Sequence, residues 1–188
     1  NCVPTLHSTI MDVTRLQLPH GVCAELCQHK FTVRKSELEA RETESDRASL
    51  VRFLSMRELS KMCPLLAKTI RHTIAEANSK WQLLLTDSTN RLCVRYEVQY
   101  SEYNSGMHYS SWHIDSDSLS CDKRKITMVI QLNSGFEGGE FQVNTGIPET
   151  LELGEGGSVI FPSETVVHRV LPCKSGCRKS LVIWAEAR

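Results

Sequence analysis

The sequence of 188 residues lacks any apolar run close to the ~20 residues that a bilayer-spanning helix needs, so no transmembrane segment is expected. It also lacks an excess of charge, with 22 Lys and Arg against 22 Asp and Glu. This balance gives no reason to expect nucleic acid or an anionic membrane as a partner. Internal repeats and low-complexity tracts are missing too, and the length predicts one globular domain with a sizeable core.

Cysteines are numerous, eight in all, but none forms the C-x-x-C pair of a zinc knuckle. Cys23 and Cys27 suit one face of a helix, where free thiols pack as small apolar groups. A disulfide across a turn stays open for Cys173 and Cys177. We expect mostly reduced, structural cysteines, with the compartment open and the cytoplasm favoured. Because the chain begins without an initiator Met or an apolar leader, we expect a trimmed chain, from which any targeting segment would have been lost.

The apolar periodicity divides the chain into a helical first half and a strand-rich second half. Apolar residues recur at spacings of three and four from Leu59 to Trp81, which predicts a helix, and 21–31 predicts a shorter one. From residue 82 the apolar residues alternate, and Gly-rich turns separate the segments. This pattern predicts a mainly β fold, a β-sandwich or jelly-roll barrel buttressed by helices. We expect residues 1–188 to form one domain, with 1–81 as a helical support region and 82–188 as the jelly-roll core.

His113 and Asp115 lie one residue apart at the end of a predicted strand, so both side chains can leave one face of an extended backbone. A facial iron site needs two neutral imidazoles and one carboxylate. His168 is the best-placed third ligand, because it is in phase with Val166 and Val170 and therefore faces inward. A hydrogen-bonded core histidine is the alternative for this position.

Arg178 follows His168 by ten residues and is in phase with Ser180 at the start of the last predicted strand. A buried arginine is costly to desolvate unless an anion meets it, and its planar fork suits a carboxylate. The metal triad and this clamp together predict a small acid that reaches from Arg178 to the metal.

The stretches GMHYSSWHID, LNSGFEGGEFQV and GSVIFPSETVVHRVLPCKSGCRKSLVIW resemble the iron(II)/2-oxoglutarate-dependent oxygenases of the prolyl 4-hydroxylase-like branch. The resemblance implies a double-stranded β-helix, which is a jelly roll. It places the H-x-D…H metal triad on His113, Asp115 and His168, and the basic residue that binds 2-oxoglutarate on Arg178. It also implies iron(II), 2-oxoglutarate and dioxygen as cofactors and co-substrates, with ascorbate as a candidate reductant.

Further contacts to 2-oxoglutarate are implied by the same resemblance. The tyrosine that the family places near this co-substrate falls on Tyr103, and the family's small hydroxyls near the pocket fall on Thr127 and Ser180. Gln131 stands where some relatives carry a second tyrosine for the distal carboxylate. An amide can also donate a hydrogen bond there.

The resemblance implies hydroxylation of an unactivated C–H bond, with decarboxylation of 2-oxoglutarate to succinate, on a prolyl or other amino-acid side chain of a peptide or protein. Tyr109 and Trp112 are candidates to line the substrate entrance, and the charged stretch 36–47 is a solvated face or a lid.

An oxygenase of free amino acids or small biosynthetic intermediates stays open, because substrate-binding parts vary within a fold. Nucleic-acid repair is disfavoured, because Ile183 replaces that group's second arginine. A non-catalytic jelly-roll binding module is disfavoured by the intact triad, and the oligomeric state stays open.

Overall fold

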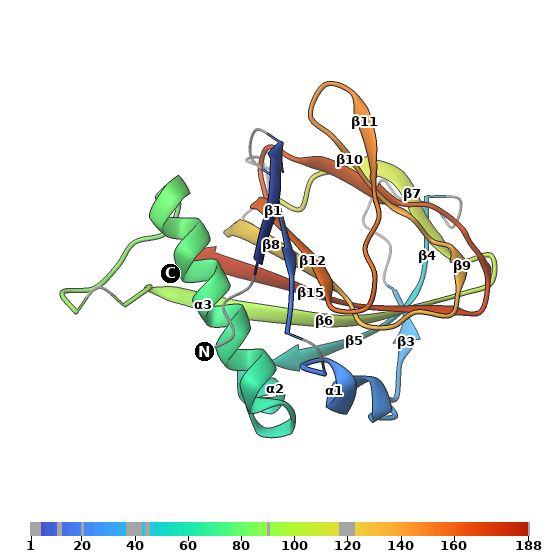
Figure 1. The fold of residues 1–188 in the computed structure, drawn as a ribbon, viewed down its shortest axis with the longest axis horizontal. Helices are drawn as coiled ribbons and strands as arrows, with labels where there is room; N and C mark the ends of the chain where they lie inside the picture. The colour runs from blue at the N-terminus through green and yellow to red at the C-terminus, as the bar shows by residue number, and fades with distance from the viewer. Residues whose placement is uncertain are drawn as a thin grey trace.

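Two large β-sheets, a small two-stranded sheet and a layer of helices make up the part of the chain that the computed structural model describes (Figure 1). The described residues are 5–10, 13–19, 21–36, 43, 46–89, 91–116 and 123–187. The helices are α1 (Ala24–Gln28), α2 (Met56–Met62) and α3 (Pro64–Trp81). The strands are β1 (Thr5–Ile10), β2 (Val13–Gln17), β3 (Arg34–Lys35), β4 (Arg47–Ala48), β5 (Leu50–Ser55), β6 (Val94–Asn104), β7 (His108–His113), β8 (Arg124–Gln131), β9 (Glu137–Gly138), β10 (Phe141–Asn144), β11 (Pro148–Leu151), β12 (Gly157–Pro162), β13 (Val167–Val170), β14 (Cys173–Ser175) and β15 (Cys177–Ala187).

The larger sheet has eight strands in the order β1-β2-β12-β8-β15-β6-β5-β3, and the smaller has five in the order β11-β10-β13-β7-β4. Every pairing is antiparallel, and β6 pairs with β15 along its whole length. The two sheets enclose a core of their own, while helices cover the opposite face of the larger sheet (Figure 1). This is the double-stranded β-helix, or jelly roll, with flanking helices that the sequence predicted.

Side chains alternate between the two faces of β6 and β15, so each strand contributes to both cores. Val98 and Ile183 belong to the core under the helices, whereas Tyr103 and Val182 face the space between the sheets. The predicted apolar stripe from Leu59 to Trp81 also packs into the helix-side core. It spans two helices, because Pro64 occupies the first turn of α3, where its missing N–H leaves no hydrogen bond unmade.

The first 81 residues are not only a helical support region, and this part of the prediction was wrong. Their described part contains five strands, of which β2 pairs with β12, β5 with β6, and β4 with β7. These strands have between two and six residues, and partners distant in the chain stabilise them. Local pattern is therefore a weak signal for them. Of the charged stretch that was considered as a lid, residues 37–42 and 44–45 lie outside the described residues.

The described cysteines are free thiols, so the Cys173–Cys177 disulfide is not formed. Cys23 and Cys27 pack on the helix-side core around α1, as predicted for structural thiols. Burial, with smaller contributions from the nearby Cys27 and Glu155, raises the pKa of Cys23 to about 12. Within the described part of the chain, none of the helices is both long and apolar enough to cross a membrane.

Candidate metal centre

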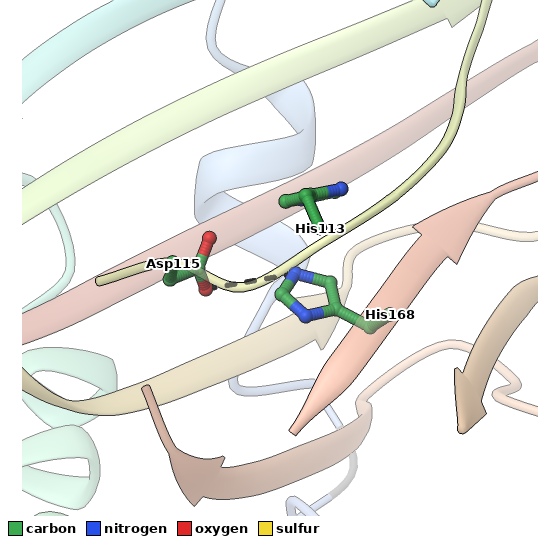
Figure 2. A group of neighbouring side chains, drawn as sticks. All are labelled: His113, Asp115 and His168. Carbon is green, nitrogen blue, oxygen red and sulfur yellow. Dashed lines mark ion pairs between the residues drawn. The ribbon is translucent and has the colours of Figure 1, made fainter. Parts of the chain in front are cut away.

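His113, Asp115 and His168 converge between the two sheets (Figure 2), with one potential ligand atom from each lying within 4.8 Å of the others. The register of β13 against β7 sets His168 directly opposite His113, so their ring centres are 4.3 Å apart. Asp115 follows β7 by two residues, and its backbone N–H donates to Ser163 O at 3.2 Å. The distance from His168 Nε2 to Asp115 Oδ2 is 3.6 Å. The structure therefore brings together the three residues that the sequence predicted as metal ligands.

Both histidines are oriented by backbone carbonyl groups. His113 Nδ1 lies 2.9 Å from Ser111 O, and His168 Nδ1 lies 3.1 Å from Val166 O. A hydrogen on each Nδ1 satisfies these carbonyls and leaves each Nε2 lone pair available to a metal. Burial, together with the neighbouring His168, lowers the pKa of His113 to about 3. At neutral pH His113 is therefore the neutral imidazole that metal binding requires.

Asp115 is held as a carboxylate. Burial alone would raise its pKa, but His168, His113 and a hydrogen bond from Thr127 together hold the pKa below its ordinary value. Thr127 Oγ1 donates to Asp115 Oδ2 at 2.8 Å and also lies 2.8 Å from Ser163 Oγ. Thr127 is not among the described residues that line the cavity, where it was predicted to contact 2-oxoglutarate. It orients the acidic ligand instead.

A cavity of about 300 Å³ opens beside the triad, with Arg178 at its wall. Arg178 is 1% exposed. Its Nη1 donates to Ser180 Oγ at 3.2 Å, while its buried Nη2 has no hydrogen-bond partner. Its Cζ lies 5.3 Å from the centre of the Tyr103 ring. No carboxylate of the described residues pairs with Arg178, so this buried cation is suited to bind an acidic ligand in the cavity.

Gly139 makes room for Arg178, a role that sequence reasoning missed. A Cβ at this position would lie 2.8 Å from Arg178 Cδ, closer than real Cβ contacts, and the residue has a φ of +66°. A left-handed backbone of this kind favours glycine. The Gly-Gly pair at 138–139 was visible in the sequence, but its contact with Arg178 depends on the three-dimensional packing.

Comparison with known proteins also indicates chemistry that depends on iron(II) and 2-oxoglutarate. The model of the 2OG-Fe(II) oxygenase superfamily matches residues 98–186, which contain the triad and Arg178. Residues 98–186, just under half of the chain, are thus similar to the oxygenase domain of this superfamily. Members of the superfamily use iron(II), 2-oxoglutarate and dioxygen.

Two curated relatives are similar to this oxygenase domain. A PKHD-type hydroxylase of Colwellia psychrerythraea is 37% identical over 94 residues, 46% of this chain and 41% of that protein. A PKHD-type hydroxylase of Idiomarina loihiensis is 29% identical over 93 residues, 48% of this chain and 42% of that protein. The chain thus spans about two fifths of the length of these relatives.

Solved structures share the fold. A prolyl-4-hydroxylase of Pseudomonas putida superposes with a TM-score of 0.69 at 20% identity, covering 94% of this chain and 93% of that one. A prolyl hydroxylase of Trichoplax adhaerens, in complex with a hypoxia-inducible factor peptide fragment, gives 0.67 at 16% identity, covering 93% and 83%.

The entrance of the oxygenase cavity contains only one of the two aromatic residues predicted for it. Tyr109 lines the cavity and stacks on His113, with ring centres 3.7 Å apart and an interplanar angle of 12°. Trp112 is not among the described lining residues and packs instead under Arg169, whose Cζ is 4.2 Å from the ring centre.

Gln131 and Ser180 were both predicted to contact 2-oxoglutarate, and the structure separates them. Ser180 lines the cavity beside Arg178. Gln131 is not among the described lining residues, and its Nε2 donates to Lys179 O at 2.9 Å. Sequence reasoning also missed Arg47, which lines the cavity from the short strand β4.

Proposed function

We propose that this chain hydroxylates an amino-acid side chain, with proline as the first candidate, in a peptide or protein substrate. Bound iron(II), 2-oxoglutarate and dioxygen supply the oxidation, in which 2-oxoglutarate is decarboxylated to succinate while a C–H bond becomes C–OH. The single observation that carries the proposal is that two imidazoles, one carboxylate and one buried guanidinium without an ion-pair partner among the described residues line one cavity.

The residues divide into two groups by role. His113 and His168 would hold the iron through Nε2, and Asp115 would hold it through its carboxylate, which offsets part of the metal charge. Arg178, with Ser180 and Tyr103 beside it, would bind the distal carboxylate of 2-oxoglutarate. Three protein ligands leave about three octahedral positions, enough for a chelating keto acid and dioxygen.

A peptide substrate is supported by the open side of the cavity. Phe53 and Ile114 line it and are 43% and 37% exposed, so apolar surface is available at the entrance for a partner chain. The structural relative from Trichoplax adhaerens was solved with a peptide fragment, and the curated relatives are named as hydroxylases.

The test measures succinate formed from 2-oxoglutarate under air with iron(II), with and without prolyl peptides, and follows each peptide by mass spectrometry. We expect peptide-stimulated succinate and the gain of one oxygen atom on proline. His168→Ala should abolish both, whereas the exposed His72→Ala serves as a matched control that retains them. Stimulation by free amino acids but by no peptide would overturn the peptide assignment, and failure to consume 2-oxoglutarate at all would overturn the reaction.

A further inference from the structure

Positive charge is concentrated around the cavity of the candidate metal centre. Asp115 is the single carboxylate among the described lining residues, whereas four arginines line it: Arg34, Arg47, Arg124 and Arg178. Since Asp115 faces the metal position, the remainder of the cavity is cationic. A concave surface with one sign of charge attracts ligands of the opposite sign.

Three of these arginines are accounted for: Arg34 and Arg124 have interactions within the protein, and Arg178 has a proposed ligand. Arg178 is the proposed contact for 2-oxoglutarate. Arg124 donates to Glu97 Oε2 at 2.7 Å, and its Cζ lies 3.9 Å from the centre of the Trp184 ring. These three guanidinium groups are therefore not assigned to a substrate.

Arg47 is different. It pairs opposite Tyr109 in the β4–β7 register, and its Cζ lies 4.7 Å from the centre of the Tyr109 ring. Its Nε is buried without a hydrogen-bond partner, and no carboxylate of the described residues forms an ion pair with it. A guanidinium that is fixed against a ring and partly desolvated binds an anion with less loss of side-chain freedom than a surface arginine does.

The position of Arg47 limits where that anion lies. The Tyr109 ring contacts both Arg47 and His113, with ring centres of Tyr109 and His113 3.7 Å apart. Together these spacings limit the distance between the Arg47 guanidinium and the His113 ring to no more than about two extended residues, at ~3.3–3.6 Å per residue. Exposed Phe53 and Ile114 line the same cavity and suit apolar neighbours of the charged group.

We propose that Arg47 binds the carboxylate of an Asp or Glu side chain within about two residues of the hydroxylated residue. The substrate would then be an acidic peptide that also carries apolar residues. This inference rests on the peptide hydroxylation proposed above and specifies its substrate class.

The test uses matched peptides with a central proline that differ at one position, two residues before or after it: Asp or Glu, Asn or Gln, and Lys. Anisotropy of labelled peptides gives their affinity for the protein loaded anaerobically with iron(II) and 2-oxoglutarate, and succinate release gives turnover. We expect acidic peptides to bind about tenfold or more tightly than their amide counterparts, as a charge-assisted hydrogen bond implies. Arg47→Gln should remove that preference, and Arg47→Glu should transfer it to the lysine peptides.

Arg57→Glu on the exposed face of α2 makes the same charge change outside the cavity and should leave the preference intact. Equal affinity for the three peptide types, or an acidic preference that survives in Arg47→Gln, would overturn the role of Arg47. Failure of the wild-type protein to bind iron(II) and 2-oxoglutarate would instead overturn the proposed reaction, so the two failures are distinguishable.

Discussion

Gly139→Ala tests whether the shape of the wall behind Arg178 controls 2-oxoglutarate binding. The new Cβ would lie 2.8 Å from Arg178 Cδ, so the arginine side chain must move. Overpacking of this kind typically costs ~1–3 kcal/mol. The left-handed backbone at φ +66° adds about 1–2 kcal/mol for any residue with a Cβ. If the crowding is relieved by displacing the guanidinium, the affinity for 2-oxoglutarate should fall roughly 5- to 150-fold.

Gly135→Ala is the matched control for this prediction. Its φ is +80°, but no atom lies within 4 Å of its hypothetical Cβ, so it carries the backbone strain without the contact. Both variants should lose thermal stability, and only Gly139→Ala should lose affinity in an anaerobic titration with 2-oxoglutarate. Equal affinity in the two variants would refute the idea that Gly139 positions Arg178.

Three further predictions concern single side chains. Thr127→Val removes the donor to Asp115 and should weaken iron(II) binding about 10- to 100-fold in a metal titration; unchanged affinity would rule out this orienting role. Arg178→Met should weaken 2-oxoglutarate binding about 30-fold or more. It should also raise the melting temperature of the ligand-free protein, because an unpaired buried charge is removed; a lower melting temperature would contradict this. At pH 8 Cys23 should resist iodoacetamide in the native protein, since raising its pKa from 9.0 to about 12 reduces the thiolate about a thousandfold. Rapid native labelling would contradict its burial.

The candidate site was predictable from sequence wherever it lies in long strands with clear alternation. His168 and Arg178 are in phase with apolar or small neighbours in β13 and β15, so their inward direction followed from period two. The prediction that His113 and Asp115 leave the same face of the backbone rested on the same period of two. Their convergence additionally required the fold, which the resemblance supplied.

The parts that were missed depend on contacts between distant segments. Arg47 lies in a strand of two residues that pairs with β7, a segment distant in the sequence. Gly139 leaves room for the side chain of Arg178, a residue that is distant in the sequence. Thr127 was placed in the pocket by analogy, but the packing of β8 against β12 brings its hydroxyl to Asp115 and Ser163. No local sequence pattern encodes such contacts.

Anaerobic titration of the protein with iron(II) and then 2-oxoglutarate tests the central claim most directly. A keto acid chelated to iron that is held by two imidazoles and one carboxylate should give a weak visible charge-transfer band that saturates at one equivalent of each. The band should be lost in His168→Ala and should require much more 2-oxoglutarate in Arg178→Met. A wild-type protein that shows no band, or a band that His168→Ala leaves unchanged, would contradict the assignment of His113, Asp115 and His168 as the metal ligands.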